Sequence, residues 1–227
     1  KAFKWAFNPP TSYWDGASMI LQGISDGNLD SLKDKKIAFL HLDHPYGKEP
    51  IPLFETLAST HGFTLLPIPV GLTEMQNQSA QWLQIRREKP DFVIMWGWGA
   101  MNGGAIAEAV KTRYPINQFV SVWWGAHEPD LKLVGEQGKG YRALSWNFAD
   151  SDSKLMQDVK KYVVDAGKSQ INQQGGEFDS TSYQRGILMS VILAEAVKAA
   201  QDKADTPNIN REQLRVGLEN VNIDEAR

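Results

Sequence analysis

The chain has 227 residues, of which 42% are hydrophobic and 22% charged, and it carries a formal net charge of −3. This length can bury a substantial core in one large or two small domains, and the slight negative charge gives no electrostatic reason to expect a nucleic-acid partner. The absence of cysteine excludes disulfides, thiolate metal sites and cysteine nucleophiles. No window approaches the ~18 apolar residues of a membrane span. The opening KAFKWAF lacks a signal-peptide pattern, as a mature or truncated chain would.

Residues 33–147 are predicted to form an α/β lobe with a mostly parallel sheet. The expected strands are 37–42, 63–70, 91–96, 118–124 and 141–148, and the expected helices are 50–60, 79–88 and 102–113. Strands that alternate with helices imply β-α units with right-handed crossovers, which place helices on both faces of the sheet. Pro67 and Pro69 favour an edge position for the second strand, whereas the highly apolar third strand is expected to be central.

The rest of the chain is mainly helical in pattern. Helices are expected at 14–24, 153–167, 182–201 and 209–220, with a polar loop at 169–180. The helix at 182–201 has the broadest apolar stripe. An amphipathic helix is stable in a protein when its apolar face packs against another part of the fold. We therefore expect residues 1–32 and 148–227 to form part of a second lobe whose sheet is missing from this chain.

Aromatic side chains gather in three loops that follow predicted strands. In an open parallel sheet, ligands bind beyond the carboxyl ends of the strands. The loops 41–47, 96–104 and 123–130 all fall at that edge. The candidate ligand-binding aromatics are Tyr46, Trp98, Trp123 and Trp124, with Trp96 in the same wall or in the core beneath it. Such a patch marks a ligand groove or a partner surface, and stacking of flat rings is its natural use.

Four polar residues in the same loops are candidates for contacts to a ligand. They are Asp43, Asn102, His127 and Glu128. Asp43 and Glu128 stand beside helix starts, so capping is an equally good interpretation of both. The basic pair Arg86-Arg87 is interpreted as a solvated helix face. Asn8, Tyr13 and Trp14 are weaker candidates for an opposite rim of the site.

Several other chemistries are disfavoured by the pattern. Residues 97–102 resemble a dinucleotide-binding fingerprint, but Asn102 replaces the third glycine and Trp98 stands where a pyrophosphate needs bare backbone. There is no GxxxxGK[ST] and no GxSxG motif. A metal or acid–base cluster would have to be assembled from His41, Asp43, His44, His127 and Glu128. No HExxH-type spacing supports it, so no metal, cofactor or catalytic residue is expected.

With these residues in view, the chain resembles the periplasmic solute-binding proteins of branched-chain amino acid-type ABC transporters, which have the type I periplasmic binding protein fold. The resemblance starts in KKIAFLHLDHPYGKEPIPLFETLASTHGFTLLPIPV, where Asp43 and Tyr46-Gly47 match a turn of the family. It continues through QSAQWLQIRREKPDFVIMWGWG and ends with FDSTSYQRGILMSVILAEAVKAA, a late helix of the N-terminal lobe. Order and spacing agree over essentially the whole chain, although no single motif is specific.

The resemblance implies an internal piece of a longer protein, with one complete C-terminal-type lobe and part of the N-terminal-type lobe. It implies a ligand in a cleft between lobes, with Tyr46 and Trp98 at aromatic cleft positions. Where amino-acid binders carry an acid for the ligand ammonium, this chain has tryptophan around Trp123 and Trp124, and only Glu128 stands nearby. That departure favours an aromatic or flat apolar solute, with a carboxylate as an option.

The resulting hypothesis is a non-enzymatic, extracytoplasmic component of an ABC importer that delivers its solute to a membrane permease. Binding of branched-chain amino acids or amides, and a cytoplasmic ligand-sensing domain of the same fold, remain as alternatives. An α/β enzyme that uses the loop with His41, Asp43 and His44 is a weaker third class, because no nucleophile with an adjacent base is identifiable. The incomplete lobe exposes apolar surface, which offers a route to a dimer.

Overall fold

The computed structural model describes residues 3–8, 11–147, 149–171 and 177–223, which form two compact units. One unit is Thr11–Trp146, and the other combines Lys1–Pro10 with Asn147–Arg227. No helix among the described residues is both long and apolar enough to cross a membrane.

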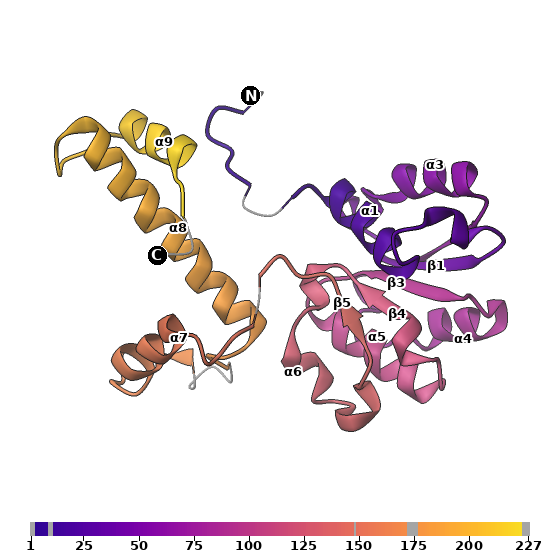
Figure 1. The fold of residues 1–227 in the computed structure, drawn as a ribbon. Helices are drawn as coiled ribbons and strands as arrows, with labels where there is room; N and C mark the ends of the chain where they lie inside the picture. Colours follow the sequence, from indigo (N-terminus) through magenta and orange to yellow (C-terminus); the bar gives the residue numbers. More distant parts are fainter. Residues whose placement is uncertain (1–2, 9–10, 148, 172–176, 224–227) are drawn as a thin grey trace. The chain divides into compact units, whose positions relative to one another are not determined.

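A five-stranded, all-parallel sheet forms the centre of the Thr11–Trp146 unit, in the order β2-β1-β3-β4-β5 (Figure 1). The strands are β1 (Lys36–Leu42), β2 (Thr64–Val70), β3 (Phe92–Trp96), β4 (Phe119–Ser121) and β5 (Arg142–Ala143). The predictions that β2 is an edge strand and β3 a central one are confirmed. Pro67 and Pro69 are both exposed on β2, where a missing N–H disturbs no second neighbour.

Helices cover both faces of this sheet, as predicted (Figure 1). The helices are α1 (Tyr13–Ile24), α2 (Pro45–Lys48), α3 (Ile51–His61), α4 (Ser79–Glu88), α5 (Ala100–Lys111) and α6 (Glu128–Leu131). Successive residues of a strand point to opposite faces. On β1, Ile37 and Phe39 therefore pack in the cluster that includes α1 and α3, whereas Ala38 and Leu40 pack in the cluster that includes α4 and α5.

The first helix belongs to this unit and not to the second one. The sequence predicts a boundary at residue 33, but the compact unit begins at Thr11. The physical reason is the apolar face of α1: Ala17, Ile20 and Leu21 are buried in the same cluster as the β1 residues Ile37 and Phe39. A helix that buries its apolar face on the sheet folds with that sheet.

Two predicted strands are shorter than expected. β4 ends at Ser121, and Trp123–Gly125 forms a 3-10 turn in place of the predicted strand end. The chain folds back closely there, since a Cβ on Gly125 would lie 2.2 Å from Ser121 Oγ. Because β4 is so short, only Arg142–Ala143 of the predicted strand 141–148 pairs with it, and residue 148 lies outside the described residues.

The regular secondary structure described in the second unit is helical. Its helices are α7 (Lys154–Val159), α8 (Thr181–Ala204) and α9 (Arg211–Asn220), and a π-helical turn at Lys160–Val164 follows α7. Helices α8 and α9 approach closely, because a Cβ on Gly217 would lie 2.1 Å from the Ala196 carbonyl oxygen. Residues 172–176 of the predicted polar loop lie outside the described residues. The assignment of this unit to an N-terminal-type lobe stays a prediction.

Candidate functional site

The carboxyl ends of three neighbouring strands define the candidate site. β1, β3 and β4 lie side by side and run parallel, so the loops that follow them meet at one edge of the sheet. The chain passes from β1 outward to β2 and later from β3 outward to β4 on the other side. In an open parallel sheet, the usual place for a ligand is where the chain reverses in this way, here beyond the carboxyl ends of β1 and β3.

Tyr46 connects the loops that follow β1 and β3. It lies on α2, whose Gly47 packs so tightly on the end of β1 that a Cβ there would lie 2.0 Å from the Leu42 carbonyl oxygen. The Tyr46 hydroxyl donates a hydrogen bond to the Gly97 carbonyl, 3.0 Å away, in the loop after β3. Burial raises the pKa of the Tyr46 hydroxyl above its ordinary value, so the group stays a protonated donor.

Tyr13, in the first turn of α1, connects the loops that follow β1 and β4. Its ring stacks on Trp123 at a centroid distance of 4.9 Å and meets Tyr46 edge-on at 5.3 Å. Its hydroxyl accepts a hydrogen bond from Trp124 Nε1 at 2.9 Å. One turn later, a Cβ on Gly16 would lie 2.6 Å from a carbon of the Trp123 ring, so α1 packs directly on that ring.

Two of the five predicted aromatics are part of the core. Trp96 and Trp123 are 0% and 3% exposed and belong to the cluster that includes α1 and α3. Trp96 is the last residue of β3 on the face covered by those helices, and the stacked Tyr13 ring covers Trp123. The burial of Trp96 agrees with the alternative that it lies in the core, whereas the expectation that Trp123 walls a ligand disagrees with its burial. Both rings support the site from beneath.

Trp98 and Trp124 present their rings at the surface, 63% and 45% exposed. Trp98 stands between two glycines with distinct backbone roles. A Cβ on Gly97 would lie 2.5 Å from Asn102 Oδ1, and Gly99 has a φ of +55°. Only glycine adopts both arrangements without strain. We call Tyr13, Tyr46, Trp98 and Trp124 the aromatic rim.

The predicted polar residues divide into one framework residue and three at or near the surface. Asn102 is 2% exposed, and its Nδ2 donates a hydrogen bond to the Trp124 carbonyl at 2.8 Å. Its Oδ1 is buried and has no hydrogen-bond partner among the described residues. Asp43 is exposed and paired with Lys48, which lowers the pKa of the Asp43 carboxyl. His127 precedes α6, and the exposed Glu128 begins that helix.

His41, an alternative candidate for acid–base chemistry, is buried at the end of β1. Its ring stacks on Phe39, and its Nδ1 lies 3.1 Å from the Leu42 carbonyl oxygen. Desolvation lowers the pKa of the His41 imidazole, which favours the neutral form. Nowhere in the described part of the chain do three or more His, Asp or Glu side chains come close enough to hold a metal ion.

Tyr13 lies beside Trp124, whereas the sequence predicts Tyr13 and Trp14 on an opposite rim. Both residues belong to the Thr11–Trp146 unit. Asn8, the third residue of that group, lies in the other unit. The capping box formed by Ser12 and Asp15 signals the helix start in the sequence. The residues around Tyr13 carry no sequence signal that this helix end contacts a loop more than a hundred residues away.

The sequence model of the family described as periplasmic binding protein matches residues 2–227. The chain belongs to that family. This confirms the predicted resemblance, and no curated protein sequence matches the chain significantly.

Solved structures of the family share the fold. A structure described as an ABC transporter permease from the Pseudomonas fluorescens group is 34% identical, with a TM-score of 0.80 over 95% of this chain and 52% of the other. A branched-chain amino acid ABC transporter protein from Thermus thermophilus with bound valine is 18% identical, with a TM-score of 0.74 over 94% and 53%. A solute-binding protein from R. palustris in complex with benzoate is 19% identical, with a TM-score of 0.58 over 90% and 50%.

These likenesses confirm the predicted fold class, an α/β lobe of the type I periplasmic binding protein. The chain spans about half the length of the structures that it matches.

Proposed function

We propose that this chain is part of the solute-binding component of an ABC importer and that the aromatic rim holds a small aromatic or flat apolar solute. The observation that carries the proposal is the exposure of Trp98 and Trp124 at the carboxyl ends of the adjacent strands β3 and β4. Membership of the periplasmic binding protein family supports the same function. The solute is bound and released without chemical conversion.

The rim suits a flat solute because the residue Trp124 is held before the solute arrives. Trp124 is fixed by Tyr13 at its indole nitrogen and by Asn102 at its carbonyl. A preformed site loses less conformational freedom on binding, so more of the contact energy appears as affinity. Each well-placed ring pair contributes about 0.5–1.5 kcal/mol beyond its buried area. The benzoate bound by the R. palustris relative is a solute of this shape.

A branched-chain amino acid is the second candidate, and Glu128 favours it. Its exposed carboxylate stands four residues after Trp124 and is an acceptor of the kind that an ammonium group needs. The Thermus thermophilus relative carries valine. The two candidates differ in the group that anchors them: an indole face for the aromatic solute, a carboxylate for the amino acid.

Membership of the family supports two further parts of this function, the partner and the place of action. The partner of a solute-loaded importer component is a permease in the membrane, and the place of action is extracytoplasmic. A sensing role for the same fold inside the cell is the alternative, in which closure on the solute alters a regulator. Co-purification with a membrane permease supports transport, and its replacement by a regulator supports sensing.

The test is calorimetric and fluorescence titration of the chain with benzoate and with valine. We expect benzoate to bind, and Trp98→Ala or Trp124→Ala to weaken it by about 2- to 12-fold, the loss of one ring pair. Leu83→Ala is the matched control, because it removes exposed apolar surface from α4 in the same unit. Valine binding that is abolished by Glu128→Gln, with no response to benzoate, would overturn the aromatic assignment.

A further inference from the structure

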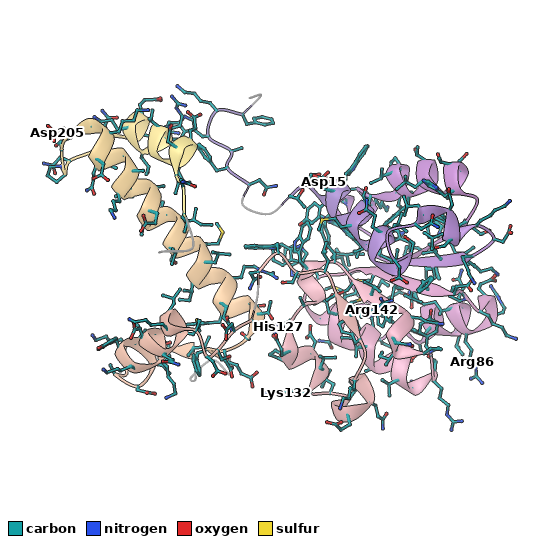
Figure 2. All side chains as sticks on the ribbon, viewed as in Figure 1. Asp15, Arg86, His127, Lys132, Arg142 and Asp205 are labelled. Atoms are coloured by element: carbon teal, nitrogen blue, oxygen red, sulfur yellow. The ribbon has the colours of Figure 1, made fainter. Side chains whose placement is uncertain are left out.

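A hollow of about 290 Å³ lies at the opposite, amino edge of the same sheet. It is formed where α4 and α5 end, and Figure 2 shows Arg86 at the far side of the unit from His127. Three basic side chains line it: Arg86 and Lys89 from the end of α4, and Arg113 from the end of α5. Its wall also contains the ring of Tyr114.

The three cations have no ion pair among the described residues. The acidic residues on the same segments have basic partners of their own: the pairs are Glu88 with Lys36 and Arg87, Asp91 with Lys35, and Glu108 with Lys111. The nearby acidic side chains therefore do not neutralise the positive charge around the hollow.

The helix ends do not account for this charge. Each helix C-terminus carries roughly −0.5 elementary charge, so the two ends together offer about −1. Three cations exceed that by about two positive charges. The sequence interpretation of Arg86 as part of a solvated helix face explains one exposed arginine, but not three cations from two helices around one hollow.

The backbone gives a second, independent observation. Lys89 and Arg113 both have left-handed backbone conformations, with φ of 49° and 57°. The other described non-glycine residues with positive φ are aspartates. Aspartate tolerates that region, whereas a long side chain there costs about 1–2 kcal/mol. Glycine or asparagine usually stands at this position after a helix. At both helix ends, the basic side chain is present in spite of its conformational cost.

We propose that this basic hollow binds a small phosphate-type oxyanion. Two guanidinium groups and one ammonium supply donors that match tetrahedral or paired oxygens, and arginine binds such groups through two parallel hydrogen bonds. A multivalent anion gains most, because a single charge at the surface is strongly screened. The site is separate from the aromatic rim and takes ligands of opposite character. The oxyanion comes either from a free phosphate compound or from a phospholipid headgroup.

The first experiment is calorimetric titration with pyrophosphate at low salt. We expect binding that weakens steeply as salt is added, and a loss of about tenfold in affinity with Arg86→Gln or with Arg113→Gln. Arg87→Gln is the matched control: it removes the same charge from the adjacent position of the same helix, but Arg87 pairs with Glu88 and does not line the hollow. Affinity in this control should stay within about twofold.

The second arm distinguishes the two sources. Co-sedimentation with vesicles of phosphatidylcholine that contain phosphatidylglycerol reports a headgroup, whereas pyrophosphate reports a free anion. Binding in either arm that falls with Arg86→Gln and persists with Arg87→Gln supports the proposal. Equal loss in the two variants, or no binding in both arms, overturns it. Thermal unfolding of each variant shows that a loss of binding is not a loss of fold.

Discussion

The two edges of the sheet in the Thr11–Trp146 unit contrast sharply. At the carboxyl edge, hydrogen bonds hold two aromatic side chains, because Tyr46 donates to the Gly97 carbonyl and Trp124 donates to the Tyr13 hydroxyl. At the amino edge, Arg86, Lys89 and Arg113 surround an open hollow without partner acids among the described residues. Both edges belong to the same sheet, but different helices supply them: α1 and α2 at the carboxyl edge, α4 and α5 at the amino edge. The difference teaches that one parallel sheet presents surfaces of different polarity at its two edges, because different side chains stand in the loops there.

The largest expected change in the free energy of unfolding comes from the core beneath the rim, and a matched substitution in the rim itself should have little effect. Trp96→Ala should lower the free energy of unfolding by about 3–5 kcal/mol, because it leaves a cavity under the loops. Trp98→Ala, two residues along the chain, should change it by less than about 0.5 kcal/mol, since that ring is exposed. Urea unfolding of both variants measures the difference. Equal losses would contradict the division into core and rim.

The pH dependence of stability should also differ between the two edges, because His41 titrates at the carboxyl edge and the amino edge carries arginine and lysine. The pKa of His41 is lowered by burial, so the unfolded chain binds a proton more readily than the folded one. The stabilisation is therefore complete above the unfolded pKa of about 6.5 and is lost as pH falls towards the lower folded-state pKa, by at most about 1.4 kcal/mol per pH unit. Arginine and lysine at the amino edge stay charged over this range.

His41→Gln removes that contribution. Urea unfolding from about pH 8 down to about pH 5 should show a wild-type advantage that shrinks with acidity. Curves that remain parallel over the whole series would mean that His41 is not held in its neutral form.

A smaller effect tests whether the rim is one framework. Tyr13→Phe keeps the ring stacked on Trp123 but removes the acceptor of the Trp124 indole N–H. We expect a loss of about 0.5–1.5 kcal/mol in unfolding free energy, the usual contribution of one hydrogen bond. The emission of Trp124 should also shift to longer wavelength as its ring becomes more mobile and more hydrated. An unchanged spectrum would show that Tyr13 does not hold this ring.

The smallest expected change in the free energy of unfolding is at the amino edge, where a substitution should stabilise the fold and not destabilise it. Lys89→Gly relieves a left-handed backbone conformation, while glycine gains freedom in the unfolded chain. The two effects nearly cancel, and we expect a stabilisation of less than about 1 kcal/mol. Lys89→Ala is the control, because it removes the charge and keeps the Cβ. Chemical denaturation in which alanine matches glycine would rule out relief of the backbone.

Much of the fold follows from local pattern. The alternation of apolar strands and amphipathic helices predicts the parallel sheet, and Pro67 and Pro69 predict its edge. The pattern also predicts that the loops after β1, β3 and β4 share one edge. These features depend on residues near one another in the sequence, where periodicity and backbone chemistry are informative.

The partition of the aromatics could not be predicted in the same way. Trp96 and Trp98 have the same side chain and stand two residues apart, yet one is sealed in the core and the other exposed. What separates them is the arrival of α1, which covers Trp123 and Trp96 with the ring of Tyr13. That packing depends on a helix distant in sequence. The sequence predicts this helix in the other lobe, so it does not predict that Tyr13 covers Trp123, and it leaves Trp96 either in the wall of the site or in the core.

The link between Tyr13 and Trp124 also bears on the order in which the chain folds. These residues are 111 positions apart, so their hydrogen bond closes a loop that contains nearly the whole sheet. Closing this loop has an entropic cost, and that cost is offset only after the strands between the two residues have assembled. We therefore expect the rim to mature late in refolding, with strand pairing complete before the two indoles near Tyr13 reach their native fluorescence.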